Sequence, residues 1–190
     1  MNIPISFLIT LAIALCSTSA WPRELGAPGV QEVDIAGIRN YSQIEGNSGF
    51  TGPLIGFGGA TQPSAMALLR SRGFASVIDL RLTEDEDTDI EANRAAAMAV
   101  KLEFIHLPFD VKNPAPDLVE RYLAALGNPA RQPVFTHCSS ATRAAALWMI
   151  ARVQRDGMSF AHASAEASLI AEKPDQAIAF ARAWLDSTQK

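Results

Sequence analysis

Residues 137–143 read His-Cys-Ser-Ser-Ala-Thr-Arg and combine a nucleophile with an anion-binding side chain. They follow an apolar run at 133–136 and lead into an amphipathic stretch, which predicts a loop between a buried strand and a helix. The first N–H groups of a helix lack internal acceptors and carry the positive end of its dipole, so they can bind phosphate or stabilise a thiolate. Cys138 is therefore a candidate nucleophile, and Arg143 offers a planar fork to two oxygens of an oxyanion.

Each of these side chains also has an ordinary structural interpretation when it is taken alone. Cys138 would be a small buried hydrophobe, His137 a core histidine, and Arg143 a surface residue of a first helical turn. Their spacing, with a strand before and a helix after, favours chemistry over those interpretations. The residues expected to form the phosphate-binding loop are Ser139, Ser140, Ala141, Thr142 and Arg143.

Apolar periodicity along the chain predicts the elements that must hold this loop. Strands are expected at 54–57, 75–80, 103–107 and 133–136, and helices at 62–72, 90–100, 116–126, 143–155, 159–171 and 174–186. Strands that alternate with helices indicate an α/β fold whose parallel strands are covered by helices. We expect one domain with a mostly parallel sheet of about four to five strands.

A run of carboxylates between Glu84 and Glu91 follows the second of these strands. It lacks the glycine and the ligand spacing of a calcium loop, and the chain has only two cysteines, which excludes a Cys-rich zinc site. A solvated loop that leads into the first turn of a helix is the favoured interpretation. No metal and no cofactor are predicted.

The composition limits the partners that the chain can bind. Of its 190 residues 48% are hydrophobic and 19% are charged, with a net charge of −4, which excludes a disordered chain. The absence of a Lys/Arg cluster argues against nucleic acid, because affinity for nucleic acid comes largely from neutralised phosphates. Any anion must therefore be bound locally, at the loop; the natural substrate and the oligomeric state stay open.

The N-terminus carries the pattern of a secretory signal. No charged side chain precedes Arg23, and an apolar run at 7–16 gives way to small residues that end at Ala20. This predicts a signal peptide at 1–20, a periplasmic or secreted protein, and no stable membrane insertion after cleavage. An uncleaved anchor and a buried first helix are the alternatives. Cleavage would remove Cys16 and leave Cys138 as the single cysteine. In the remaining chain, an irregular lead-in at 21–48, with at most one edge strand, precedes a folded domain at 49–187.

The motifs around the loop resemble those of a known superfamily. His-Cys-x4-Arg at 137–143 is similar to the His-Cys-x5-Arg loop of the cysteine-based phosphatases with the tyrosine-phosphatase fold, but it is one residue shorter. With its flanking residues it resembles the small bacterial beta-lactamase hydrolase-like phosphatases. GGATQPSAMALLRSRGFASVIDLR and FIHLPFD followed by NPAPDLVERYLAAL match the elements that precede the catalytic strand in that family, so the resemblance covers roughly residues 37–172.

The resemblance implies that the domain at 49–187 is phosphatase-like and that its partner is a phosphorylated substrate, either a protein or a small molecule. It also implies a role for each site residue. Cys138 would attack phosphorus and form a phosphocysteine, Arg143 would bind the phosphoryl oxygens, and His137 would support the thiolate. Expelling an alkoxide at neutral pH requires an acid, and Asp110 stands where relatives carry the aspartate of their acid loop. Asp110 is therefore the expected general acid and later the base that activates water. Asp117 is interpreted as an early helix residue.

Three positions depart from the family pattern. Ala141 replaces a glycine at a turn expected to need a positive φ, Ala144 replaces a Ser or Thr that hydrogen-bonds the leaving thiolate, and Ser139 replaces an arginine. These departures keep open a weakly active or inactive oxyanion-binding module on the same fold. A rhodanese-like sulfurtransferase is a further alternative, because its loop also has the Cys-x4-Arg length.

Overall fold

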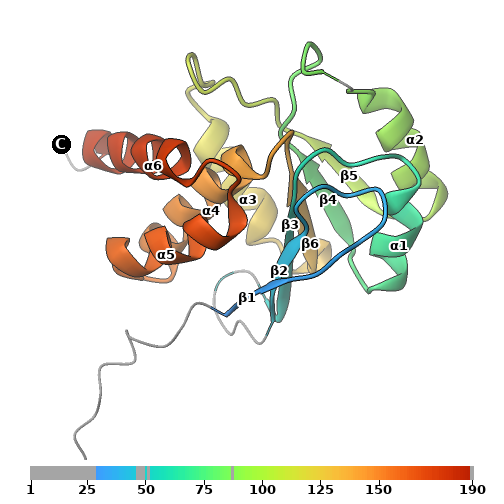
Figure 1. Cartoon of the computed structure of the whole chain (residues 1–190), viewed down its shortest axis with the longest axis horizontal. Helices are drawn as coiled ribbons and strands as arrows, with labels where there is room; N and C mark the ends of the chain where they lie inside the picture. The colour runs from blue at the N-terminus through green and yellow to red at the C-terminus, as the bar shows by residue number, and fades with distance from the viewer. Residues whose placement is uncertain (1–28, 46–49, 51, 87, 189–190) are drawn as a thin grey trace, which may run out of the picture.

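The computed structural model describes residues 29–45, 50, 52–86 and 88–188, and its centre is one twisted six-stranded sheet. The strand order is β1-β2-β3-β6-β4-β5, in which β3, β6, β4 and β5 are parallel neighbours while β1 and β2 pair antiparallel at one edge. Figure 1 shows the sheet between two groups of helices. The predicted single-domain, mostly parallel α/β fold is therefore confirmed.

The elements lie close to the predicted ranges because most of them carry strong apolar periodicity. Their bounds are β1 Val30–Glu32, β2 Ser42–Glu45, β3 Leu54–Gly58, α1 Ala65–Ser71, β4 Ser76–Asp79, α2 Ile90–Ala99, β5 Glu103–His106, α3 Leu118–Leu126, a 3-10 turn Pro129–Arg131, β6 Val134–His137, α4 Thr142–Arg155, α5 Phe160–Ile170 and α6 Pro174–Thr188.

The strand number differs from the expected four to five. Both β1 and β2 lie in the segment 21–48, for which an irregular lead-in with at most one edge strand was the expectation. Their three and four residues are too few to show a period of two, and β2 buries the polar side chains of Ser42 and Gln43. Pairing with the edge of β3 forms these strands, and that pairing leaves no local signal in the sequence.

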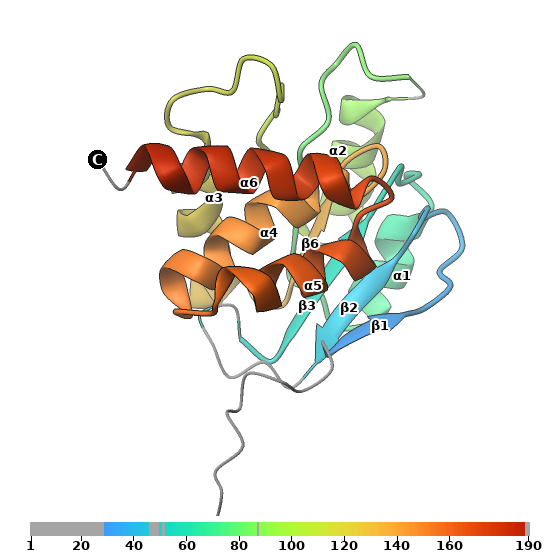
Figure 2. The same cartoon turned by 60° about the vertical axis from the view of Figure 1, so that its left-hand side comes forward.

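Two hydrophobic cores hold the sheet in place. One core joins the sheet to α1 and α2, and the other joins it to α3, α4, α5 and α6. Figure 2 shows α5 and α6 side by side over α4, which is buried along most of its length. Leu147, Trp148 and Ile150 of α4 are fully buried, and each such side chain contributes roughly 1.5–3 kcal/mol of transfer free energy. The helix that follows the His-Cys loop is therefore held firmly in the core.

The N-terminal predictions fall on residues that the structure does not describe. The signal peptide at 1–20, its cleavage site and Cys16 lie outside the described residues. Among the helices of the described ranges, none combines the length and the apolar character that crossing a membrane requires.

Candidate active site

The His-Cys loop joins the end of a central parallel strand to the start of the central helix. His137 is the last residue of β6 and Thr142 the first of α4. The amide of Cys138 donates to the carbonyl of Gly58 at 3.2 Å, and the carbonyl of Ser139 accepts from Ala60 at 3.0 Å. The loop is thus fixed to the end of β3, as expected for a ligand site at the carboxyl ends of parallel strands.

Ala141 holds the left-handed backbone conformation that the family resemblance implies at this position. It precedes α4 with φ +59° and ψ −6°, the left-handed region, which costs a residue with a Cβ roughly 1–2 kcal/mol. Its side chain is fully buried. The turn therefore retains the shape that a glycine would give it, at a cost in stability.

Ala141→Gly is expected to stabilise the protein by about 0.5–1 kcal/mol, because relief of the left-handed strain exceeds the backbone entropy that glycine loses. Urea unfolding of the two proteins measures the difference. Ala145→Gly is the matched control, because this buried residue lies within α4 and its replacement should destabilise by about 1 kcal/mol. Destabilisation by both substitutions would show that relief of backbone strain at Ala141 does not stabilise the protein.

Arg143 connects the loop to two neighbouring segments. Its Nη1 donates to the carbonyl of Phe109 at 3.2 Å, and its Nη2 donates to the hydroxyl of Ser139 at 2.9 Å and to the carboxylate of Asp85. Burial lowers the pKa of Arg143, but the bond to Asp85 and the negative charges of Cys138 and Asp85 outweigh it and raise this pKa. The guanidinium is therefore charged and held beside the sulfur of Cys138.

Asp85 is the site residue that the sequence did not indicate. The acidic run was predicted to be a solvated loop, and most of its carboxylates are exposed, but only 19% of the Asp85 side chain is exposed. Its Oδ2 accepts from the Ser139 hydroxyl at 3.1 Å and from the Leu82 amide at 3.1 Å, besides Arg143. The interpretation as a wholly solvated loop is wrong at this residue, because β4 ends next to β6 and brings the turn after it onto the His-Cys loop.

The ion pair with Arg143 determines how Asp85 titrates. Burial alone would raise the pKa of Asp85, but its hydrogen bond to Arg143 and the positive charge there bring it below the ordinary value of 3.8. A carboxyl group whose pKa is lower in the folded than in the unfolded state stabilises the fold above the unfolded value and loses this effect as pH falls through the folded value. The pair is therefore intact at neutral pH and is lost only in acid.

Asp85→Asn is expected to lower kcat about tenfold and to weaken vanadate binding, because the charged hydrogen bond that orients Arg143 is lost. Steady-state kinetics and vanadate inhibition measure both effects, and the difference in Tm from the parent protein should shrink below about pH 4. Glu86→Gln, at an exposed position on the same loop, is the control and should change neither. Tighter vanadate binding by Asp85→Asn would mean that Asp85 competes with the oxyanion instead.

Asp110 lies on the same side of the loop as Arg143. Both side chains line a pocket of about 260 Å³, together with Ser140 and Thr142. Asp110 is half-buried just beyond β5, and its Oδ1 accepts the amide of Lys112 at 2.9 Å. Cys138 is 1% exposed. The pocket therefore brings together Asp110, the expected acid, and Arg143, the expected phosphoryl-binding side chain. Asp117 lies at the start of α3, with Arg121 3.9 Å away.

His137 lies behind the nucleophile in a buried polar cluster. Its Nε2 is 3.6 Å from Oδ2 of Asp79 on the neighbouring strand, and both side chains are fully buried. Burial lowers the pKa of His137 and Arg81 lowers it further, although Asp79 acts in the opposite direction. The imidazole is thus neutral at neutral pH, and it contacts the site through the backbone that leads to Cys138.

The hydroxyl groups of the loop bond to one another and to neighbouring segments. Ser140 donates to Thr142 at 3.1 Å, and Thr142 accepts the amide of Lys173 at 3.1 Å. Within the described residues no hydroxyl bonds to the sulfur of Cys138, and Ala144 is fully buried. Neither Ser140 nor Thr142 therefore replaces the hydroxyl that the family carries after its arginine.

Metal-binding side chains do not cluster in the part of the chain that the structure describes. Among the described residues, no three His, Cys, Asp or Glu side chains come together in a way that could hold a metal ion. The side chains assembled at this site are a thiol, a guanidinium, two carboxyl groups and the hydroxyl groups of Ser139, Ser140 and Thr142.

A parallel strand, a Cys-x4-Arg loop and a central helix define the class of the cysteine-based phosphatases with a tyrosine-phosphatase fold. Residues 51–181 match the sequence profile of the PTP-NADK family, described as a DSP-PTPase phosphatase fused to NAD+ kinase. The match covers more than half of the chain, so the chain belongs to this phosphatase family. No curated protein matches the chain in sequence.

Solved structures share the fold at low sequence identity. A DUF442 protein from Shewanella putrefaciens CN-32 has 18% identity and a TM-score of 0.59, over 80% of this chain and 96% of its own. P. aeruginosa TpbA has 18% identity and a TM-score of 0.59, over 83% of this chain and 91% of its own. The core of the PP-IP phosphatase SIW14 from S. cerevisiae has 19% identity and a TM-score of 0.56, over 67% and 78%. At these identities the likeness establishes the fold.

Proposed function

We propose that this phosphatase hydrolyses phosphate monoesters through a phosphocysteine on Cys138. The observation that carries the proposal is the placement of Cys138 and Arg143 on one loop at the start of α4, with Asp110 lining the same pocket as Arg143. The first N–H groups of α4 and the guanidinium of Arg143 would bind the phosphoryl oxygens. A variant of TpbA has been solved in complex with pTyr, which is consistent with such a substrate.

The first step transfers the phosphoryl group to the enzyme. The thiolate of Cys138 attacks phosphorus, an S–P bond forms, and the P–O bond to the leaving group breaks. Asp110 donates its proton to the departing oxygen, which leaves as an alcohol or phenol. Arg143 stabilises the charge on the equatorial oxygens throughout this step.

The second step releases inorganic phosphate. Asp110, now a carboxylate, takes a proton from a water molecule that attacks phosphorus. The P–O bond to water forms as the S–P bond breaks, and the thiolate of Cys138 is restored. His137 supports the thiolate by holding the start of the loop, and Asp85 is a positioning residue for Arg143.

Asp110→Asn is expected to lower kcat about a hundredfold for phenyl phosphate, because the amide has no proton to donate to phenolate. The loss should be several times smaller for 4-nitrophenyl phosphate, whose leaving group departs without protonation. Parallel kinetics on the two esters measure this difference. Asp117→Asn, at the exposed aspartate that precedes α3, is the control. Equal losses on both esters would show that Asp110 is not the acid.

Hydrolysis of an aryl phosphate with inhibition by vanadate is the primary test of this function. Activity is expected to persist in a chelator, since the scheme assigns no step to a metal. Phosphate affinity with no turnover on any ester would support the binding module that Ala141 and Ala144 suggest. Transfer of sulfur from thiosulfate to cyanide would instead identify the sulfurtransferase.

We further propose that the protein acts in the periplasm or outside the cell, on the basis of the apolar run at 7–16 and the small residues before Trp21. Fractionation of the cells that make it, with N-terminal sequencing of the recovered protein, tests this location. A chain that starts at Trp21 in a periplasmic or secreted fraction is expected. A chain that keeps its N-terminal segment in the cytosol would contradict it.

A further inference from the structure

Most arginines of the described residues are neutralised by carboxylates. The arginine–carboxylate ion pairs in this part of the chain are Arg39–Glu172, Arg81–Asp79, Arg94–Glu91, Arg121–Asp117, Arg131–Glu103, Arg143–Asp85, and Arg152 with Asp156 and Glu166. Lys112 and Lys173 have no carboxylate within 4.0 Å among the described residues. In a protein with a net charge of −4 these two unpaired ammonium groups are notable because they line the same pocket.

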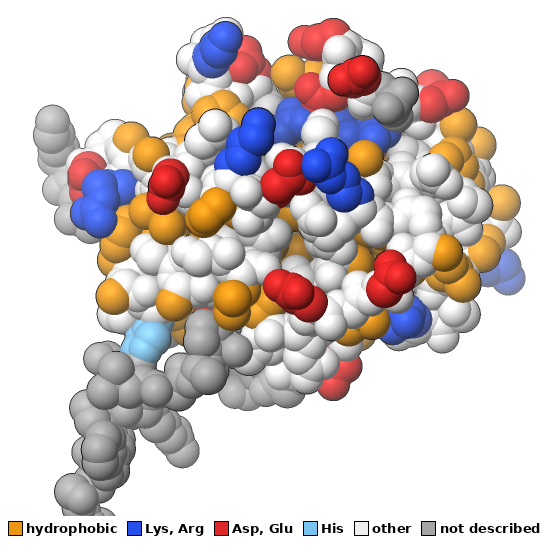
Figure 3. Space-filling view, viewed as in Figure 1, with side chains coloured by type: hydrophobic (Ala, Val, Ile, Leu, Met, Phe, Trp, Pro, Cys, Tyr) orange, Lys and Arg blue, Asp and Glu red, His pale blue; other side chains and the backbone are white. Residues whose placement is uncertain are grey.

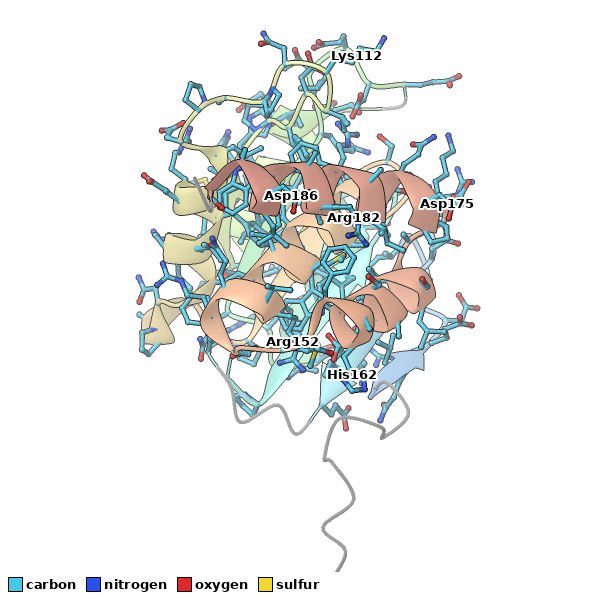
Figure 4. All side chains as sticks on the ribbon, turned by 90° about the vertical axis from the view of Figure 1, so that its left-hand side faces the viewer. Lys112, Arg152, His162, Asp175, Arg182 and Asp186 are labelled. Carbon is cyan, nitrogen blue, oxygen red and sulfur yellow. The ribbon has the colours of Figure 1, made fainter. Side chains whose placement is uncertain are left out.

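The two lysines reach this pocket from opposite segments, and the backbone of each is held there. The amide of Lys112 donates to Oδ1 of Asp110 at 2.9 Å, and the amide of Lys173 donates to the hydroxyl of Thr142 at 3.1 Å. Figure 4 shows Lys112 on the loop that projects beyond α6, and Lys173 immediately precedes that helix. Figure 3 shows Lys and Arg side chains gathered over the upper part of one face, near the β6–α4 loop of Figure 1.

The pocket is on the leaving-group side of the site. Asp110 lines it, and the proposed acid must lie next to the oxygen that departs with the leaving group. Part of the wall is apolar, because Phe109 and Phe180 pack edge to face in it with ring centroids 4.8 Å apart. A leaving group that fits this pocket has an apolar or ring-like body near the phenylalanines and a charged end near the lysines.

We propose that the preferred substrates are phosphate monoesters whose leaving group carries a second anionic group, a carboxylate or another phosphate, which binds Lys112 and Lys173. This inference rests on the proposed function. Both lysines are exposed, so each contributes modestly and is screened by salt. Together they provide selectivity on the order of tenfold, and that selectivity falls as ionic strength rises.

The test compares phenyl phosphate with 3-carboxyphenyl phosphate and with 1,3-phenylene bisphosphate. The meta carboxylate adds charge with little effect on the basicity of the phenolate. We expect kcat/KM for both charged esters to exceed that for phenyl phosphate about tenfold at low salt. The ratio should approach one for the double variant Lys112→Gln/Lys173→Gln and stay unchanged for Arg72→Gln/Lys101→Gln, which removes the same charge from exposed positions outside the pocket.

The two charged esters also distinguish a carboxylate from a phosphate as the second anionic group of the substrate. A higher ratio for the carboxylate alone would identify carboxylated leaving groups, and a higher ratio for the bisphosphate alone would identify phosphorylated ones. A ratio near one in the parent protein, or a ratio that the double variant leaves unchanged, would overturn the proposal.

Binding of non-hydrolysable analogues keeps this test independent of turnover. Calorimetry with benzylphosphonate and 3-carboxybenzylphosphonate should show the same lysine-dependent preference. If no ester is hydrolysed but the carboxylated phosphonate binds more tightly through the lysines, the proposed function fails and the selectivity stands. If all three esters are hydrolysed at similar rates, the function stands and the selectivity fails.

Discussion

Cys138→Ser is expected to lower turnover of phenyl phosphate by at least about a thousandfold, because a serine hydroxyl at this site has no base to activate it and cannot form the phosphocysteine. The substitution changes one atom of a side chain that is 1% exposed, so the fold and the anion site should persist. Phosphate affinity should therefore stay within a few fold of the parent value. Steady-state kinetics and calorimetric phosphate binding measure the two quantities.

Two controls make the result on Cys138 interpretable. The thermal unfolding of the Cys138→Ser protein must match that of the parent, so that lost turnover is not lost folding. Cys138→Ala should be equally inactive. Turnover by either variant within tenfold of the parent rate would show that the cysteine is not the nucleophile.

Arg143→Lys is expected to lower kcat by a factor on the order of 10²–10³, the typical cost of removing one donor that stabilises charge in the transition state. Lysine keeps the charge but loses the planar fork, and so it cannot bind Asp85, Ser139 and a phosphoryl group together. Vanadate affinity should fall in parallel. Kinetics and vanadate titration at fixed pH measure both effects.

Arg121→Lys is the matched control for Arg143→Lys. Arg121 lies on α3 with its guanidinium half exposed, 3.9 Å from Asp117, and its replacement should leave kcat within twofold. A similar loss in both variants would indicate a general effect of the exchange. Unchanged vanadate affinity in Arg143→Lys would remove Arg143 from the oxyanion site.

The sequence predicts the central elements because their signals are local. The apolar run before His137 and the amphipathic pattern after Arg143 lie within a few residues of the loop, and β6 and α4 form there. The positive φ at Ala141 is expected only from the family resemblance, because an alanine gives no local signal for a left-handed backbone. The strand, the loop and the helix could therefore be placed without knowledge of the sheet order.

The features that the sequence did not predict depend on contacts between distant segments. Asp85 acts through Arg143, 58 residues away, and nothing in the run of carboxylates distinguishes it from its exposed neighbours. The useful signal is positional, because Asp85 follows a strand that is a plausible sheet neighbour of the catalytic strand. Strands β1 and β2 depend in the same way on an edge that forms only in the folded sheet.

The lysine pair of the pocket can be recognised only when the sequence and the fold are considered together. Lys112 and Lys173 are ordinary exposed residues in the sequence, and only the fold brings the β5–α3 loop and the start of α6 to one pocket. Their lack of a carboxylate partner is a property of the packed surface among the described residues. Substrate preference is therefore the part of the function that sequence motifs alone predict least.

Intact-mass measurement of protein quenched in acid during turnover of phenyl phosphate tests the phosphocysteine most directly. The phosphocysteine mechanism predicts an adduct of about 80 Da that peptide mapping assigns to Cys138 and that is absent from Cys138→Ser. An adduct of about 32 Da after exposure to thiosulfate would indicate a persulfide on the same sulfur. Sustained phosphatase turnover with no adduct on Cys138, at quench times shorter than one turnover, would contradict this mechanism.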